Sequence, residues 1–262
     1  MKLSIVSDEL RIEQKDALPL IAEWGLTNVE LRGMPGGRLP DGDVEQVAQL
    51  VKTHGMTVTG LSPGCFKCEP DAKAIEKDLD RLRRTLPLCQ TFNCDTIIAF
   101  SVKARPGQPP SGTRHPADFV VEGLREAGRI AAEKGVRIAL ENEPGFTAVG
   151  ARSAAILIDR IGMENVGANW DPGNAWPWDV EIASGPRILG ERIFNVHVKD
   201  TARRDGERVF DVAGRGSVGW KQQVDQFGEM GYDGAIVVET HFEPGVEKSR
   251  ENVDILKKWL GL

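Results

Sequence analysis

A phrase repeats along this chain: a helical stripe of apolar residues, then a glycine, then a short run of β-forming residues. Just past the end of a helix the backbone commonly adopts a positive φ, which glycine tolerates best and asparagine next best. Each phrase therefore predicts a helix end that leads into a strand. The junction residues are Gly25, Gly55, Asn93, Gly135, Gly162, Gly190 and Gly231.

The segments on either side of these junctions have matching periodicities. Apolar side chains recur at helical spacing within residues 17–24, 44–51 and 75–86, and a last helix is expected from about Val246 to Trp259. β-rich runs alternate with these helical segments, and an additional run opens the chain. Strands are therefore expected at 3–7, 28–31, 57–60, 96–100, 136–140, 166–170, 193–196 and 235–238.

Eight strand–helix units in 262 residues give about 33 residues per unit, close to the roughly 30 of a strand–helix–strand motif. Strict alternation implies a parallel sheet with right-handed crossovers, and closing that sheet removes both of its edges. We therefore predict one α/β domain over residues 1–262, a single (β/α)8 TIM barrel with parallel strands. A doubly wound open sheet would need a glycine-rich turn after the first strand, and Ser7-Asp8-Glu9-Leu10 is not one.

The charge balance excludes several classes of function. The chain has 33 Lys and Arg against 39 Asp and Glu, a net charge of −6, which argues against a nucleic-acid partner. No apolar run approaches the roughly 18 residues of a membrane span, and no apolar signal segment opens the sequence. We expect a cytoplasmic protein with no membrane partner. Cys65 and Cys68 form a C-x-x-C pair without a second Cys or His pair nearby, so we expect reduced loop thiols.

Each of the last four expected strands ends near an ionisable residue, and barrel enzymes place their active sites at the carboxyl ends of the strands. These residues are Glu141, Asp171, His197 and Glu239, which we expect at equivalent heights on one rim. Like charges in poor solvation would then face each other, and a divalent cation resolves that conflict. Three carboxylates and one imidazole favour Mn²⁺, with Mg²⁺, Co²⁺ and Zn²⁺ also compatible. His241 is the nearest substitute ligand.

The same segments carry a family resemblance. Five segments of the sequence resemble the sugar phosphate isomerase/epimerase family, the xylose-isomerase-like TIM barrels. They are Ala139-Leu140-Glu141-Asn142 and the stretches 169–174, 196–200, 213–220 and 238–241. The resemblance covers essentially the whole chain. It implies one divalent metal held by the four residues of the rim, and isomerisation or epimerisation of a ketose or related hydroxy-carbonyl compound. It also implies a homodimer or homotetramer.

Acid–base chemistry beside a cation gives these residues their expected roles. The metal would polarise a substrate carbonyl and stabilise the enediolate left when the neighbouring carbon loses its proton. Glu141 and Glu239 approach from the fifth and eighth strands and are predicted to flank that carbon. One would remove the proton and the other would return it, and the order in which they act is open.

Other polar residues are predicted to contact the substrate. Lys199 lies two residues past His197 and so points the same way, and Arg203 stands at an offset where related epimerases use an arginine. Asn174 stands where several relatives carry a histidine, and it can reach a sugar hydroxyl. A phosphate or carboxylate site is a further possibility for Arg203, Arg204, Arg208 and Arg215, and His115 is a candidate for a lid over the site.

Three other functions compete with this interpretation. A metal-dependent dehydratase or lyase acting on a hydroxy-ketone or keto-sugar shares the proton removal but expels a β-hydroxyl. A nuclease like endonuclease IV needs several metals, many histidines and a basic groove, and this acidic chain has four histidines. A sugar-binding barrel without catalysis is disfavoured by the complete set of four predicted ligands.

Overall fold

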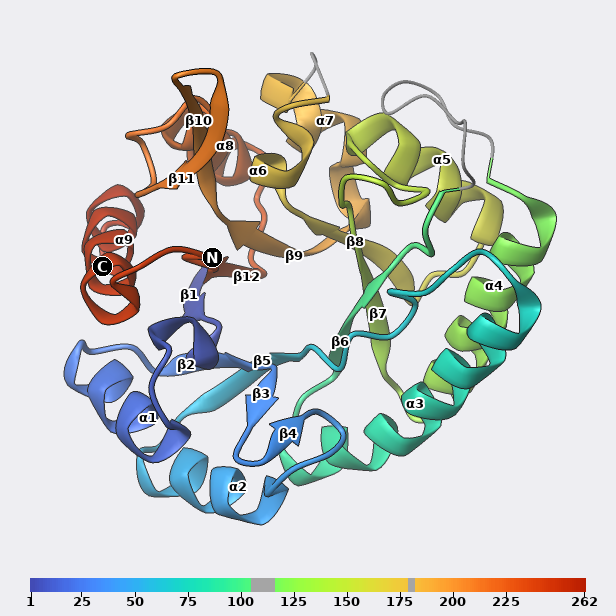
Figure 1. Cartoon of the computed structure of the whole chain (residues 1–262), viewed down its shortest axis with the longest axis horizontal. Coiled ribbons are helices and arrows are strands. Elements are labelled where there is room, and N and C mark those ends of the chain that lie inside the picture. Colours follow the sequence, from blue (N-terminus) through green and yellow to red (C-terminus); the bar gives the residue numbers. More distant parts are fainter. Residues whose placement is uncertain (105–115, 179–181) are drawn as a thin grey trace.

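The computed structural model describes residues 1–104, 116–178 and 182–262, and these residues form a (β/α)8 barrel, as predicted (Figure 1). Eight parallel strands lie in the order β1-β12-β9-β8-β7-β6-β5-β2, and a parallel bridge between Val6 and Glu30 joins the two ends of the sheet. The strands are β1 (Lys2–Ile5), β2 (Asn28–Leu31), β5 (Thr57–Leu61), β6 (Thr96–Phe100), β7 (Arg137–Glu141), β8 (Val166–Trp170), β9 (Ile193–Val198) and β12 (Ala235–Val238).

The helices surround this ring of strands in Figure 1. They are α1 (Gln14–Glu23), α2 (Val44–Thr53), α3 (Ala72–Thr91), α4 (Asp118–Ala132), α5 (Ala151–Ile161), α6 (Pro172–Ala175), α7 (Gly185–Leu189), α8 (Trp220–Glu229) and α9 (Gly245–Leu260). The predicted junction residues all have positive φ, from 48° at Asn93 to 74° at Gly25, which confirms that they end helices. None of the described helices is long and apolar enough to cross a membrane.

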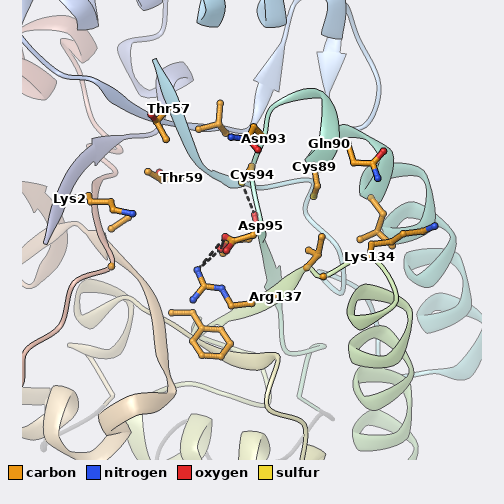
Figure 2. A pocket seen from close by; sticks show the side chains of 18 residues that line it. Lys2, Thr57, Thr59, Cys89, Gln90, Asn93, Cys94, Asp95, Lys134 and Arg137 are labelled. Atoms are coloured by element: carbon orange, nitrogen blue, oxygen red, sulfur yellow. Dashed lines mark hydrogen bonds and ion pairs between the residues drawn. The ribbon is translucent and has the colours of Figure 1, made fainter. Parts of the chain in front are cut away.

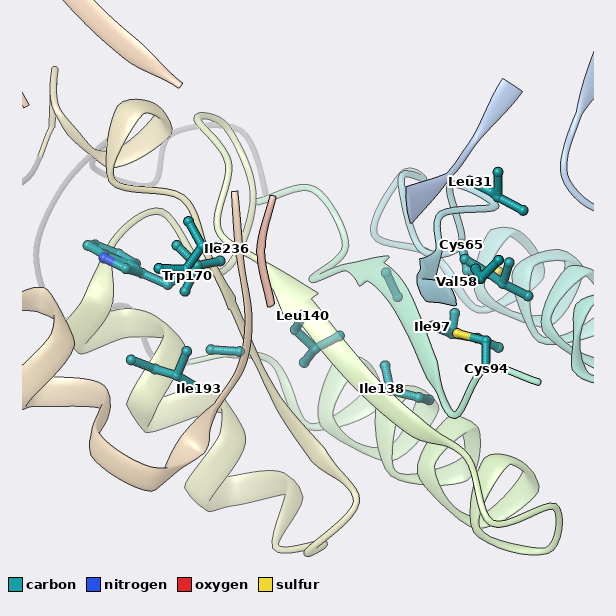
Figure 3. Packing of buried hydrophobic residues seen from close by; sticks show 14 of the residues in the cluster. Leu31, Val58, Cys65, Cys94, Ile97, Ile138, Leu140, Trp170, Ile193 and Ile236 are labelled. Carbon is teal, nitrogen blue, oxygen red and sulfur yellow. The ribbon is translucent and has the colours of Figure 1, made fainter. Parts of the chain in front are cut away.

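Alternate residues of each strand face either the helices or the inside of the barrel. Ile138 and Leu140 of β7, Trp170 of β8 and Ile236 of β12 belong to the large apolar cluster between strands and helices (Figure 3). Inside the barrel the apolar cluster is small and consists of Val6, Ala235 and Val237. Successive residues of a strand point to opposite faces, so the neighbours of the outward-facing residues point toward the inside. Glu141, Asp171, His197 and Glu239 are such neighbours.

Two antiparallel hairpins leave the carboxyl ends of barrel strands and were not predicted. The first pairs β3 (Gly33–Met34) with β4 (Gly37–Arg38), and the second pairs β10 (Asp200–Arg204) with β11 (Glu207–Asp211). Their two-residue turns are Pro35-Gly36 and Asp205-Gly206, with positive φ at Gly36, Asp205 and Gly206. Both hairpins follow strands on the side of the barrel where the predicted site lies.

The cysteines and His115 were the subject of two smaller predictions. All four cysteines are free, and no cysteine belongs to a possible metal cluster within the described residues; the reduced state of Cys65 and Cys68 stays a prediction. Burial raises the pKa of Cys65 to about 12, so its thiol stays protonated. His115, the candidate lid residue, lies outside the residues that the structure describes.

Candidate metal centre

The four predicted ligands converge at the carboxyl ends of β7, β8, β9 and β12. Glu141, Asp171, His197 and Glu239 each offer one ligand atom, these atoms lie within 4.8 Å of one another, and all four residues are buried. The strand register does not place them in one row, since Glu141 pairs with Asn169, two residues before Asp171. The tilt of barrel strands compensates for this stagger and brings side chains from successive register rows to one point.

His197 has its two ring nitrogens in different environments. Nε2 lies 3.0 and 3.1 Å from the carboxylate oxygens of Glu30, whereas the buried Nδ1 has no hydrogen-bond partner. Nδ1 is 3.6 Å from Glu141 Oε2 and 3.5 Å from Glu239 Oε2. When Nε2–H donates to Glu30, the lone pair of Nδ1 faces the carboxylates, the arrangement of a histidine ligand oriented by a second carboxylate.

The imidazole lies in a strongly negative environment. Burial alone would lower the pKa of His197, but the charges of Glu30, Glu239 and Glu141 raise it well above its usual value. A raised pKa means that these carboxylates favour a proton on the imidazole. The same negative charges would favour a metal cation bound to the imidazole instead of the proton.

Glu30 on β2 was not identified from the sequence. Its side chain is fully buried, and Asn195 Nδ2 donates a hydrogen bond of 3.1 Å to its Oε2. Gly60 makes room for it, because a Cβ at position 60 would lie 3.2 Å from Glu30 Oε2. The available signal was an acidic residue in the middle of an expected strand, where an apolar side chain is the norm.

Glu239 lies between two cations. Arg32 Nη1 is 2.8 Å from its Oε1, and Lys199 Nζ is 2.6 Å from its Oε2. Burial alone would raise the pKa of Glu239, but the charges of Lys199 and His197 lower it well below its usual value. Sequence reasoning missed Arg32, which also pairs with Asp8 and Glu9. Glu239 is therefore held ionised and in one orientation.

Glu141 has a neutral partner instead. Asn174 Nδ2 donates to Glu141 Oε1 at 3.1 Å, and the backbone N–H of Asn174 donates to Asp171 Oδ1 at 3.0 Å. Burial alone would raise the pKa of Glu141, but the charge of His197 lowers it. Asn174, predicted to contact the substrate, thus also positions two of the predicted ligands.

The donor set fits a cation. Lys199 is buried with Nζ 2.8 Å from Asp171 Oδ2 and 2.6 Å from Glu239 Oε2, so an ammonium already stands where the carboxylates attract positive charge. Asp171 Oδ2 lies within ion-pair distance of Lys199 but makes no well-aligned hydrogen bond, and His197 Nδ1 makes none either. Both are therefore buried atoms that could bind a metal. Buried polar atoms without hydrogen bonds are rare and commonly mark a ligand site.

A polar cavity of about 400 Å³ opens onto this cluster. Glu141, Asn174, Lys199 and Glu239 line it, and so do residues of the loops after β1, β2 and β5. His241 also lines it, with Nδ1 3.2 Å from Glu9 Oε1 and 3.7 Å from Glu239 Oε1. The cavity has the size of a small-molecule site.

The arginines after β9 lie apart from this cavity. Arg203 is exposed on the β10–β11 hairpin, donates to Gly206 O at 3.1 Å, and is not among the residues that line the cavity. Arg204 pairs with Asp211 and Arg215 pairs with Glu251. Arg208 Nη2 donates to Gly173 O at 2.7 Å. The structure therefore brings Lys199 and Asn174 to the cluster but leaves Arg203 outside.

A somewhat larger hollow, about 490 Å³, lies at the opposite end of the barrel (Figure 2). Residues at or just before the starts of β1, β5, β6 and β7 line it, among them Lys2, Thr57, Asp95 and Arg137, and Arg137 Nη2 is 3.3 Å from Asp95 Oδ1. In this fold the amino ends of the strands serve stability, while catalysis takes place at the carboxyl ends. The smaller cavity over the carboxylate–histidine cluster is therefore the candidate active site.

The fold and the cluster together define a parallel α/β barrel with a group of residues that could hold a metal ion at the carboxyl ends of its strands. The chain belongs to the xylose isomerase-like TIM barrel family, whose model matches residues 18–259. An inosose isomerase of Bacillus velezensis is 24% identical over 237 residues, which cover 86% of this chain and 82% of that enzyme. An inosose dehydratase of Klebsiella pneumoniae is 29% identical over 161 residues, which cover 54% of this chain and 53% of that enzyme.

Similarity to a solved structure supports the fold independently. The crystal structure of an IOLI protein with a bound zinc atom matches with a TM-score of 0.80 and 21% identity, and the match covers all of both chains. The sequence-based expectation of a xylose-isomerase-like barrel is thereby confirmed.

Proposed function

We propose that this protein is a divalent-metal-dependent isomerase or epimerase of a sugar or sugar phosphate, working by removal of the proton α to a carbonyl. The observation that carries the proposal is the pair of buried glutamates, Glu141 and Glu239, which reach one cation-binding cluster from β7 and β12. Two carboxylates beside one cation supply the acid and the base that such a proton transfer needs.

The proposed metal ligands are Glu141, Asp171, His197 and Glu239. Their mostly oxygen donor set supports Mn²⁺ as the preferred ion, and the zinc in the IOLI structure supports the divalent class. When bound, the ion would polarise the substrate carbonyl and stabilise the negative charge that develops on it.

The protein's own groups move the proton. In an epimerisation, an ionised glutamate takes the proton from the α-carbon, and the other glutamate, which must be protonated when the substrate is bound, delivers its proton to the opposite face of the same carbon. In an isomerisation the proton is delivered to the neighbouring carbon instead, and the proton of the substrate hydroxyl passes to the former carbonyl oxygen, so that atoms and charge balance. Arg32 and Lys199 keep Glu239 ionised and oriented, and Asn174 orients Glu141. Each glutamate is therefore held in place by different partners: Glu239 by two cations and Glu141 by a neutral amide.

The proposed substrate contacts are Asn174, Lys199 and Arg203. Asn174 and Lys199 line the cavity beside the cluster. Arg203 does not line the cavity, and it would reach a substrate there only after its side chain leaves the Gly206 carbonyl.

A metal-dependent dehydratase is the second candidate, favoured by the similarity to an inosose dehydratase. Inosose is a cyclic polyhydroxy ketone, so the same base can remove the same kind of proton. The carbanion then expels the β-hydroxyl as water and leaves an enone. The glutamate that returns a proton in an epimerase would here protonate the leaving hydroxyl.

The test is proton exchange in deuterated water with the metal-stripped protein reconstituted with Mn²⁺. Ketoses, their phosphates and inosose are followed by NMR for loss of the α-proton signal, and by ultraviolet absorbance for an enone. We expect exchange with at least one substrate. We expect Glu141→Gln and Glu239→Gln to slow it by about 10²-fold or more, while the exposed Glu247→Gln does not.

Metal content is measured on every variant, so that loss of the ion is distinguished from loss of the acid or base. Appearance of the enone identifies the dehydratase. Exchange at the parental rate in a metal-loaded Glu239→Gln variant contradicts the proposed acid–base role.

A further inference from the structure

Five cationic side chains, apart from His241, line the cavity over the metal cluster, and four of them already have carboxylate partners. Arg32 pairs with Asp8, Glu9 and Glu239, and Lys199 pairs with Asp171 and Glu239. Lys67 pairs with Glu143, and Arg11 pairs with Glu243. Arg38 is the fifth, and no described carboxylate lies within ion-pair distance of it.

The Arg38 side chain is nevertheless held in place. Its Nε and Nη2 donate to the Ser62 carbonyl at 3.1 and 3.0 Å, and Nη2 also lies 3.2 Å from Ser62 Oγ. Gly64 allows the guanidinium to pack closely, because a Cβ at position 64 would lie 3.3 Å from Arg38 Cζ and Nε. The guanidinium is thus fixed on one edge, and Nη1 makes no hydrogen bond to a described residue.

Arg38 is exposed to solvent, and its charge is balanced by water and by more distant carboxylates rather than by an ion pair. Partial desolvation and the neighbouring charge of Arg32 lower the pKa of Arg38, although Asp8, Glu141 and Glu239 act in the opposite direction. A guanidinium remains protonated despite such a shift. An oriented arginine with free donors is the group that recognises a carboxylate or a phosphate.

We propose that Arg38, supported by Ser62, is the binding subsite for an anionic group of the substrate, so that this enzyme acts on acidic sugars rather than neutral ones. The inference rests on the proposed function in taking the cavity as the sugar site. The metal cluster would bind the carbonyl end, and Arg38 on the β3–β4 hairpin would bind a carboxylate or phosphate at the other end. A neutral sugar would leave Arg38 without a counter-charge.

The test uses three ketoses that differ at one carbon: fructose with a hydroxyl, fructose 6-phosphate with a phosphate, and fructuronate with a carboxylate. Dissociation constants are measured by calorimetry on the Mn²⁺-loaded protein. We expect at least one anionic ketose to bind about ten- to a hundredfold more tightly than fructose, the range of a charge-assisted hydrogen bond. Which of the two binds more tightly identifies the anionic group.

The variants isolate Arg38 from general charge effects. Arg38→Gln is expected to bring the ratio of the anionic to the neutral affinity close to one, and Arg38→Lys is expected to retain part of the preference. Arg11→Gln is the matched control, because it removes a cation from the same cavity that already has its carboxylate. The ratio of affinities within one variant is insensitive to partial misfolding.

The proposal is overturned if the parental protein shows no anionic preference, if Arg38→Gln keeps it, or if Arg11→Gln loses as much. An anionic preference that depends on Arg38, without proton exchange on any substrate, would support the subsite and contradict the proposed function. Proton exchange on fructose without an anionic preference would support the proposed function and contradict the Arg38 subsite.

Discussion

Replacing Glu30 by glutamine tests whether a residue outside the predicted ligand set controls metal binding. The carboxylate accepts from His197 Nε2 at 3.0 Å and from Asn195 at 3.1 Å, and its charge makes the imidazole a stronger ligand. Glutamine keeps the shape and one acceptor oxygen but loses the negative charge. We expect the metal affinity of Glu30→Gln to fall by about 10- to 100-fold, which corresponds to about 1.4–2.8 kcal/mol.

Titration of the stripped protein with Mn²⁺ or Zn²⁺ against a competing chelator measures this change. Glu30→Ala is a useful companion, because it would also leave the His197 and Asn195 donors unsatisfied, at a cost in unfolding free energy of about 1–3 kcal/mol for each. Glu247→Gln on the surface controls for the loss of one charge. An unchanged affinity in Glu30→Gln would show that the field of Glu30 does not act on the metal site.

Two further predictions concern stability. The pKa of Glu9 is lowered from 4.5 to about 2 because the His241 hydrogen bond and Arg32 outweigh the effect of burial. Glu9 therefore stabilises the metal-free fold above pH 4.5, by on the order of 3 kcal/mol, and that contribution disappears as pH falls toward 2. Urea unfolding of Glu9→Gln should show a weaker loss of stability on acidification, and an identical pH profile would contradict this. Asp78 Oδ2 accepts the buried Phe66 N–H at 2.8 Å, so Asp78→Ala should lower the unfolding free energy by about 1–3 kcal/mol, with exposed Asp80→Ala as the control.

The barrel and its cluster could be predicted because both depend on local periodicities. Helix-ending glycines and a period of two along each strand determine where a strand ends and which side chains point inward. Glu141, Asp171, His197 and Glu239 all lie at or within two residues of a strand end, so finding the strands locates the cluster. The parallel order of neighbouring strands then brings the four together.

The partners of the cluster were missed because they depend on barrel closure. Glu30 and Arg32 come from β2 and the residue after it, and they meet His197 and Glu239 only because β2 and β1 lie side by side at the closing edge. No local pattern connects residues about 170 or 210 positions apart. The β10–β11 hairpin could have been found from its Asp205-Gly206 turn, and it explains why Arg203 lies away from the cavity.

The interior beneath the cluster supports its rigidity. Barrels of this fold usually fill the interior with branched apolar side chains. Here Asn195 bridges Glu30 and Asn169, each at 3.1 Å, and Ser4 hydrogen-bonds Thr59 at 2.9 Å. Asn195 Oδ1 and Asn169 Nδ2 have no hydrogen-bond partner among the described residues, so the restraint on Glu30 comes from the bond that Asn195 Nδ2 donates to it. A paired buried group has few alternative arrangements. The interior thereby fixes Glu30, Glu30 fixes His197, and the orientation of the proposed metal ligand is determined from the centre of the barrel outward.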